Sequence, residues 1–181
     1  LTVLISNVNK SGPTFTSGPS FTANENQTAI GTVTATDPEG DEFSFSISGS
    51  ELEITADGEL TFVTAPDYET QTSYTATVTA TDVLDNSNSQ DITVNVTDLN
   101  DNSPIFTSNN TFSADENQTA VGTVTATDAD QGDSVTFTIS GNDLEITSAG
   151  VVTFTSAPDY ETQTSYTATV TASDGVNSAT Q

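Results

Sequence analysis

Short runs in which apolar and polar residues alternate recur along the chain. Residues 29–36, 42–48, 59–63 and 74–81 are Thr- and Val-rich as a group and are bounded by Asp, Gly, Asn or Pro, which favour turns. In residues 74–81, four apolar side chains beginning at Tyr74 share one face and four threonines share the other. This period of two is typical of a half-buried antiparallel strand and gives a helix no comparable support. The chain is therefore predicted to be all-β.

The chain also repeats itself over about one domain length. Residues 21–29 match residues 112–120 at an offset of 91, and residues 65–74 are identical to residues 157–166 at an offset of 92. A period this long indicates a string of whole domains and not a solenoid of small repeats. With about seven predicted strands in roughly 90 residues, each repeat is predicted to be a Greek-key β-sandwich. The bulkiest core candidates of the first repeat are Phe15, Phe21, Phe45, Phe62 and Tyr74.

The two ends of the sequence fall at matching points of the repeat. Residues 1–5 align with residues 92–96, the last predicted strand of the first repeat, and Gln181 aligns with Gln90, just before that strand. We therefore expect an interior piece of a longer protein, in which the second sandwich lacks its last strand. An unpaired sheet edge is a template for strand addition, so this edge either frays or accepts residues 1–5 of another molecule.

The predicted fold is thus two tandem seven-stranded β-sandwiches joined end to end. No apolar run approaches the roughly 18 residues that a membrane span requires, and residues 1–6 are too short for the core of a signal peptide. The predicted bounds are residues 1–12 for the last strand and linker of a preceding repeat, 13–97 for the first repeat, 98–104 for a connector and 105–181 for the truncated second repeat.

The charge balance excludes several classes of function. The chain has 26 acidic residues and a single basic one, Lys10, which gives a formal net charge of −25. Such a surface repels nucleic acid and anionic membrane surfaces. The absence of His, Cys and Met removes the usual general base, thiol nucleophile and soft-metal ligands. Catalysis is therefore not expected.

Acidic residues recur in the connector and in the loops of both repeats. The connector reads DLNDNSP, and its carboxylate and amide oxygens are ligands that calcium binds. Two like charges about 4 Å apart repel by roughly 4 kcal/mol at an effective dielectric near 20, so a tight group needs counter-charge. Turn formation and backbone capping remain the alternative role for any single one of these residues. The carboxylates expected to meet at this junction are Glu25, Asp67, Glu69, Asp98, Asp101, Asp128, Asp130 and Asp174.

Five short motifs around this connector resemble those of cadherin repeats. They are x-E-x at residues 24–26, D-x-E at 67–69, D-x-N-D-N at 98–102, A-x-D-x-D at 126–130 and A-x-D at 172–174. Each motif is weak alone, but all five in order over nearly the whole chain are specific. The lack of Cys and the near-lack of basic residues resemble bacterial cadherin-type adhesin repeats more than animal cadherins.

The resemblance implies about three calcium ions between the repeats. Tyr68 stands where the family usually has Arg, and this departure is expected to leave the neighbouring carboxylates free to coordinate. Shared ligands such as Glu25 and Asp101 imply cooperative loading, which turns a metal-free hinge into a rigid strut. Carried over by residue, the first ion is held by Glu25, Asp67, Glu69 and Asp101; the second by Glu25, Glu69, Asp98, Asp101, Asp130 and the Leu99 carbonyl; and the third by Asn100, Asp128, Asp130, Asp174 and the Asn102 carbonyl.

The N-terminal connector, residues 7–13, is a natural comparison for the calcium linker. It has Asn7, Lys10 and Ser11 at three of the ligand positions. A lysine there opposes calcium electrostatically, so this connector is expected to bind fewer ions or none. Asp37, Glu39 and Asp82 are expected to retain at most one weak site, and Glu116, Asp159 and Glu161 form half of a further junction whose linker is not in the sequence.

The resemblance therefore implies a calcium-binding adhesion module or extender on the cell surface of a bacterium, or secreted by one. The implied partners are calcium ions and adjacent repeats of the same protein, with homophilic contacts or cell-surface glycans in addition, and with neither nucleic acid nor membrane insertion. A carbohydrate-binding sandwich is one alternative, but it needs a groove of exposed aromatic residues and the chain has no Trp. A glycosidase is another, and it needs two carboxylates roughly 5 to 10 Å apart across a cleft.

Overall fold

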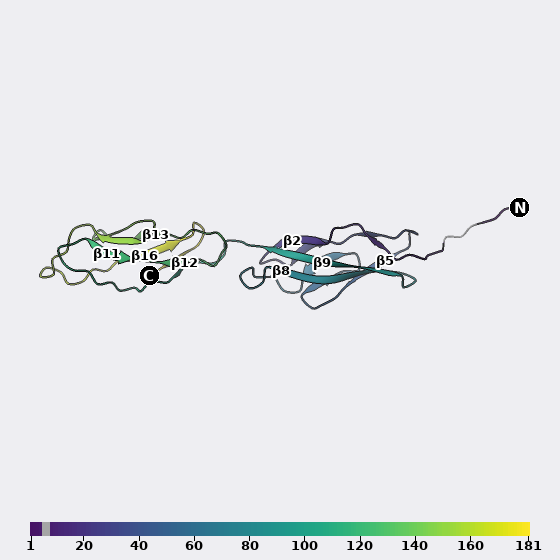
Figure 1. Ribbon diagram of the computed structural model, residues 1–181, viewed down its shortest axis with the longest axis horizontal. Coiled ribbons are helices and arrows are strands. Elements are labelled where there is room, and N and C mark those ends of the chain that lie inside the picture. Colours follow the sequence, from purple (N-terminus) through teal and green to yellow (C-terminus); the bar gives the residue numbers. More distant parts are fainter. Residues whose placement is uncertain (5–7) are drawn as a thin grey trace. The chain divides into compact units, whose positions relative to one another are not determined.

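The computed structural model describes residues 1–4 and 8–181, and all regular elements within these residues are β-strands. The chain divides into two compact units, Leu1–Leu99 and Asn100–Gln181 (Figure 1). This confirms the prediction of an all-β chain built from tandem repeats. Within the described residues, no helix is present that is long and apolar enough to cross a membrane.

The first unit is built from two main sheets. In the four-stranded sheet, the order is β2 (Ser20–Asn24), β9 (Ser87–Thr97), β8 (Ser73–Asp82) and β5 (Phe43–Ile47), with β2 parallel to β9 and the other pairs antiparallel (Figure 1). The three-stranded sheet has the order β3 (Ala29–Thr32), β7 (Glu59–Phe62) and β6 (Leu52–Ile54), and a short pair joins β1 (Thr14–Phe15) to β4 (Ala35–Thr36).

One predicted strand of this unit, residues 29–36, is in fact two. The chain pairs with β7 as β3 and then with β1 as β4, so it changes partner between Thr32 and Ala35. At the change, the Val33 amide donates to the Gly58 carbonyl and the Thr34 carbonyl accepts from the Thr16 amide. Because such changes split strands into shorter segments, the count of seven strands per sandwich stays a prediction.

Side chains from both main sheets meet in one core. Leu60, Ile92, Val33, Val78 and Val94 are its largest fully buried side chains. The predicted aromatic core residues are confirmed: Phe45 and Phe62 are buried, and Phe15, Phe21 and Tyr74 are partly buried against the same core.

The second unit repeats this plan with shorter counterparts of β5, β8 and β9. Its core holds Val124, Phe137, Val152, Val170 and Ala172. Its sheets are β10 (Ile105–Phe106) with β12 (Ala126–Thr127); β11 (Ala120–Thr123), β15 (Val151–Phe154) and β14 (Leu144–Ile146); and β13 (Thr136–Ile139), β16 (Val170–Ser173) and β17 (Ser178–Thr180).

The two units differ most around β9. In the first unit, β9 runs for 11 residues and pairs with β2 on one side and β8 on the other. Its counterpart β17 has 3 residues and pairs only with β16. Residues 111–115 and 165–169, which correspond to β2 and to the first half of β8, form no strand. In the first unit, the second half of β9 pairs with both of the corresponding segments.

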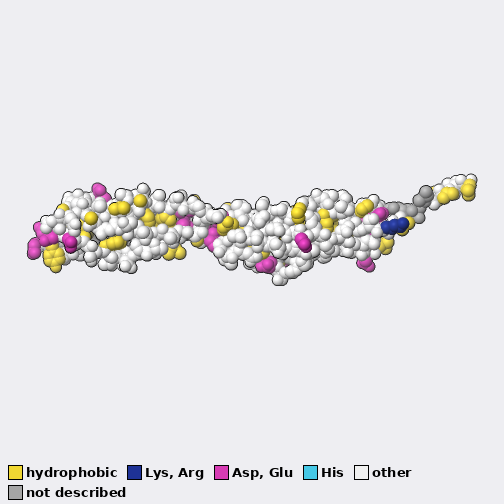
Figure 2. Space-filling view, viewed as in Figure 1, with side chains coloured by type: hydrophobic (Ala, Val, Ile, Leu, Met, Phe, Trp, Pro, Cys, Tyr) yellow, Lys and Arg dark blue, Asp and Glu magenta, His cyan; other side chains and the backbone are white. Residues whose placement is uncertain are grey.

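Figure 2 shows the acidic side chains of the face in view as magenta spots on a largely white surface, which is made of uncharged polar side chains and backbone. Leu1, Val3 and Leu4, which align with the end of β9, are exposed and belong to no strand, and Ile5 lies outside the described residues.

Candidate metal centre

Glu25 is the organising residue at the end of the first unit that leads into the linker. It follows β2 directly and is only 2% exposed, although it carries a carboxylate. Its Oε2 accepts a hydrogen bond of 2.8 Å from the Tyr68 amide, and its Oε1 accepts one of 2.8 Å from the Leu99 amide. One carboxylate thus joins the loop before β8 to the chain that leaves β9.

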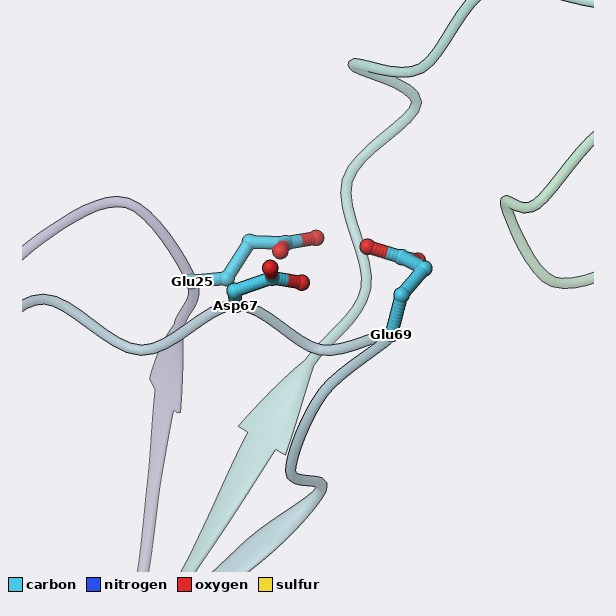
Figure 3. A group of neighbouring side chains, drawn as sticks. All are labelled: Glu25, Asp67 and Glu69. Atoms are coloured by element: carbon cyan, nitrogen blue, oxygen red, sulfur yellow. The ribbon is translucent and has the colours of Figure 1, made fainter.

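Two further predicted ligands lie beside Glu25. Carboxylate oxygens of Glu25, Asp67 and Glu69 all lie within 4.8 Å of one another, and Figure 3 shows those of Glu69 turned toward the other two. The loop is held by Asp67 itself, because its Oδ2 accepts from the Thr70 hydroxyl at 2.9 Å and its carbonyl accepts from the Gln71 amide at 2.9 Å. Three carboxylates at this spacing repel one another, which makes the group a natural site for a cation.

The first linker residues extend this group. Carboxylate oxygens of Glu69 and Asp98 lie within 4.8 Å of each other. Leu99 contributes its backbone amide to Glu25, while its side chain is 38% exposed. The first unit therefore gathers four of the predicted ligands, namely Glu25, Asp67, Glu69 and Asp98, and the backbone of a fifth, Leu99.

A second acidic group lies in the second unit. Asp128 follows β12, Asp130 lies two residues later and is 5% exposed, and Asp174 follows β16. One carboxylate oxygen from each lies within 4.8 Å of the others. Strands distant in sequence thus bring together three predicted ligands.

The rest of the linker is fastened to this second group. The Asn102 amide donates to Asp130 Oδ2 at 3.0 Å and its Nδ2 donates to Asp130 Oδ1 at 2.8 Å. Asn177 Nδ2 donates to Asn100 Oδ1 at 2.8 Å. Asp101 is exposed and accepts from Asn102 Nδ2 at 3.0 Å. Asn102 therefore contacts the second acidic group directly, whereas Asp101 belongs to no group of three carboxylates among the described residues.

Two oxygens of the second group have no protein partner. Asp128 Oδ2 and Asp174 Oδ2 are both buried without a hydrogen bond. A buried acceptor left unsatisfied costs about 1–3 kcal/mol, and more when it is charged, so a cation would be stabilising here. Burial raises the pKa of Asp174, but hydrogen bonds led by those from the Val176 and Asn177 amides together outweigh it and hold that pKa below its ordinary value. The donor set is ionised oxygen alone, which fits calcium.

The N-terminal end of the first unit is built differently. No three of its described carboxylates, including Asp37, Glu39 and Asp82, meet within 4.8 Å. Asp82 Oδ2 accepts from Asn86 Nδ2 at 2.8 Å, so its carboxylate is already satisfied. Burial raises the pKa of Asp82, and hydrogen bonds led by the one from Asn86 lower it below its ordinary value. Lys10 is exposed, and Asn7 lies outside the described residues.

The far end of the second unit is also less complete. Glu116, Asp159 and Glu161 are exposed and form no such group in the part of the chain that the structure describes. Glu116 Oε2 accepts from the Tyr160 amide at 3.0 Å, as Glu25 does from Tyr68. The second contact of Glu25, to Leu99, has no counterpart among the described residues.

Comparisons of sequence match one domain model and a set of cadherin relatives. A family model described as Bacterial Ig domain matches residues 10–97. The sequence is 33% identical to the Protocadherin-like wing polarity protein stan of Drosophila melanogaster over 97% of the chain, and 33% identical to the human Cadherin EGF LAG seven-pass G-type receptor 2 over 96%. The chain spans 6% and 7% of these relatives.

Solved structures agree. EC22-24 of mouse Cadherin-23 superposes with a TM-score of 0.78 at 25% identity, covering 97% of this chain and 64% of that one. EC1-2 of human Protocadherin-24 gives a TM-score of 0.79 at 22% identity, covering 97% and 93%. The chain is a tandem of cadherin-like repeats. Within these cadherin-like repeats, the acidic groups lie at the repeat ends nearest the linker.

Sequence reasoning missed the residues that orient the ligands of the second cadherin-like repeat. Asn177 holds Asn100 in place, and Asn100 Nδ2 in turn donates to Asp133. Asn177 aligns with Asn86 and Asp133 aligns with Asp41 of the first repeat. Their recurrence was therefore visible in the sequence, although their contacts were not.

Proposed function

We propose that calcium ions bind at the linker between the two cadherin-like repeats and stiffen an adhesive or spacer segment of an extracellular protein. The observation that supports this most directly is the placement of the linker. Leu99 is hydrogen-bonded to Glu25 in one acidic group, and three residues later Asn102 is hydrogen-bonded to Asp130 in the other. The linker therefore presents ligands to both groups.

The ligand sets follow from these groups and from the family pattern. About three ions fit the donors, because each calcium takes 6–8 oxygens and several carboxylates can bridge. In this proposal, the first ion takes Glu25, Asp67, Glu69 and Asp101; the second takes Glu25, Glu69, Asp98, Asp101, Asp130 and the Leu99 carbonyl; the third takes Asn100, Asp128, Asp130, Asp174 and the Asn102 carbonyl.

Bound calcium would supply the positive charge that these carboxylates lack. The chain holds its own ligands in position before any ion arrives: Glu25 through Tyr68 and Leu99, and Asp130 through Asn102. Preorganised ligands lose little conformational entropy on binding, which favours affinity. Once both acidic groups share ions with the linker, rotation about the linker backbone is restricted.

The setting follows from the relatives. Their names are those of cadherins and protocadherins, which favours an extracellular adhesion role over the carbohydrate-binding and glycosidase alternatives. In this role, the partners are neighbouring repeats of the same protein and like modules in homophilic contact. A bacterial surface origin stays a prediction.

Calcium titration by calorimetry, combined with solution scattering, tests this function. We expect the metal-free chain to sample a wider range of shapes and to narrow on adding calcium. Asp101→Ala should weaken binding on the order of tenfold or more, equivalent to about 1.4 kcal/mol. Asp57→Ala removes the same charge from an exposed turn outside both groups and is the matched control. Equal calcium affinity in the two variants, or a scattering curve that is the same with calcium and with a chelator, would reject the proposal.

A further inference from the structure

The N-terminal connector is held against the first unit by side chains near the start of β9. Asn88 Nδ2 donates to two connector carbonyls, that of Gly12 at 3.1 Å and that of Pro13 at 2.9 Å. Asn86 Nδ2 donates to Asn9 Oδ1 at 2.8 Å. The Asn88 amide therefore binds the connector backbone directly, just before β1 begins.

Gly12 brings the connector very close to β9. A β-carbon built on Gly12 would lie 2.8 Å from the backbone nitrogen and the carbonyl carbon of Ser87, which is closer than a side chain can approach. Because the atoms it would meet belong to backbone, they cannot rotate away, and a glycine is needed here. Pro13, the next residue, is fully buried. The connector is therefore packed onto the strand as well as hydrogen-bonded to it.

The linker after the first unit has neither feature. Ser103 stands at the position of Gly12, and Ala179 stands at the position of Asn88. Serine carries a β-carbon and alanine has no side-chain donor, so this pair cannot make the same contact. That linker contains instead carboxylates proposed as calcium ligands, whereas residues 7–13 contain no carboxylate.

The two segments thus show two ways of fastening a chain to the end of a repeat. We propose that Gly12 and Asn88 form a clamp that holds the N-terminal connector to the first unit with or without calcium, in place of ion ligands. The clamp itself is independent of the proposed calcium function, whereas the contrast with the other linker rests on it. Calcium then orders one linker and leaves the other unchanged.

The clamp uses only neutral groups, which suits a chain of this charge. Its amide and carbonyl groups carry no net charge, so salt screens their contact little. Carboxylates that gather at a linker repel one another and need counter-charge, and the chain has a net charge of −25. A neutral clamp therefore keeps the connector in place in a chelator, where the carboxylates of the other linker lack a cation.

Tryptic cleavage gives a direct measure of this clamp. Lys10 is the single basic residue of the chain, so trypsin has one site, and it lies in the connector. Lys10 is exposed, but cleavage after it requires the flanking residues, Gly12 and Pro13 among them, to leave the first unit. The rate of this cut therefore follows the opening of the clamp. We expect slow cleavage of the folded chain in a chelator and nearly the same rate in calcium, each normalised to a small lysine substrate.

Two substitutions should open the clamp. Asn88→Ala removes both hydrogen bonds to the connector and should raise the cleavage rate on the order of tenfold. Gly12→Ala should act in the same direction, and a peptide of residues 7–14 with this substitution corrects for its effect on the protease. Asn95→Ala, an exposed position of the same strand, is the matched control and should leave the rate unchanged. Equal rates for Asn88→Ala and Asn95→Ala would overturn the proposal.

Moving the cleavage site separates the clamp from the calcium function. Lys10→Gln combined with Leu99→Lys leaves one site, in the other linker, and keeps the backbone carbonyl of residue 99 that is proposed as a ligand. We expect calcium to slow this cut roughly tenfold or more, because ligated linker residues open less often. A cut in the Leu99→Lys chain that ignores calcium would contradict the proposed function and leave the clamp in place. A cut after Lys10 that calcium slows by a similar factor would contradict the clamp.

Discussion

The two units contain the same ten-residue run, residues 65–74 and 157–166, but among the described residues only the first copy contributes to a group of three carboxylates within 4.8 Å of one another. Glu25 is 2% exposed there, whereas its counterpart Glu116 is exposed. The difference is the chain that leaves β9, because Leu99 supplies the second hydrogen bond to Glu25. The strand that closes the core of a repeat therefore also builds its half of the metal centre.

The largest effect is expected from truncating a buried side chain of β9. Ile92→Ala removes a side chain that is 1% exposed and should destabilise the first unit by about 2–5 kcal/mol. Thr93→Ala, on the opposite face of the same strand, should stay within about 0.5 kcal/mol. Chemical denaturation that resolves a separate unfolding transition for each unit measures both effects. An equal loss of unfolding free energy in the second unit would show that the two cores are not independent.

Substituting each of the two equivalent glutamates separately tests the role of Leu99. Glu25→Gln makes one of two buried acceptors a donor and should cost about 1–3 kcal/mol in unfolding free energy. Glu116→Gln should change little, because this side chain is exposed and accepts only from the Tyr160 amide among the bonds found. Thermal unfolding in a chelator measures the difference without a contribution from calcium. Similar costs at both positions would mean that β9 does not matter to the acidic group.

The N-terminal ends of the two units can be compared for their affinity for calcium. Asp130→Asn should weaken calcium binding on the order of tenfold, or about 1.4 kcal/mol, because Asp130 belongs to a group with two unsatisfied carboxylate oxygens. Glu39→Gln, at the aligned position of the first unit, should leave the calorimetric titration nearly unchanged. A larger effect at Glu39 would reverse the assignment of the metal to the linker between the repeats.

The smallest effect concerns a property that the two N-terminal ends share. The pKa values of Asp82 and Asp174 are both lowered from 3.8, against the raising effect of burial, by hydrogen bonds from their own turns and from Asn9 and Asn100 respectively. Each carboxylate therefore contributes stability that is present above its unfolded pKa and is lost as pH falls through its lower folded pKa. In a chelator, Asp82→Asn should reduce the loss of unfolding free energy at acidic pH in the first unit only. The same loss of stability at acidic pH with and without the substitution would contradict this role for Asp82.

The sequence was sufficient for the fold class, and the reason is physical. The metal-ligand assignment stays a prediction, although seven of the eight predicted carboxylates lie in close groups. Alternation in residues 74–81 reports burial on one face of a strand, and the repeat offset brings equivalent loops to equivalent places. The predicted aromatic core residues followed from the same pattern. These are local or repeated signals, which one chain displays without any structure.

What the sequence did not reveal depends on contacts between distant residues. The break between β3 and β4 comes from a change of pairing partner, which alternation does not report. The burial of Glu25 depends on Leu99, 74 residues away. The orienting roles of Asn177 and Asp133 likewise depend on Asn100 across the fold.

The parallel pairing of β2 with β9 has a mechanical consequence. The pair runs from Ser20 opposite Thr93 to Asn24 opposite Thr97. Two hydrogen bonds extend it, one at each end: the Thr93 amide donates to the Pro19 carbonyl, and the Glu25 amide donates to the Thr97 carbonyl. Traction on the two ends of the first unit would pull these neighbouring strands in opposite directions along their length. All of their bonds would then bear the load together and would have to rupture at once, whereas a hairpin pulled open from its end unzips one rung at a time.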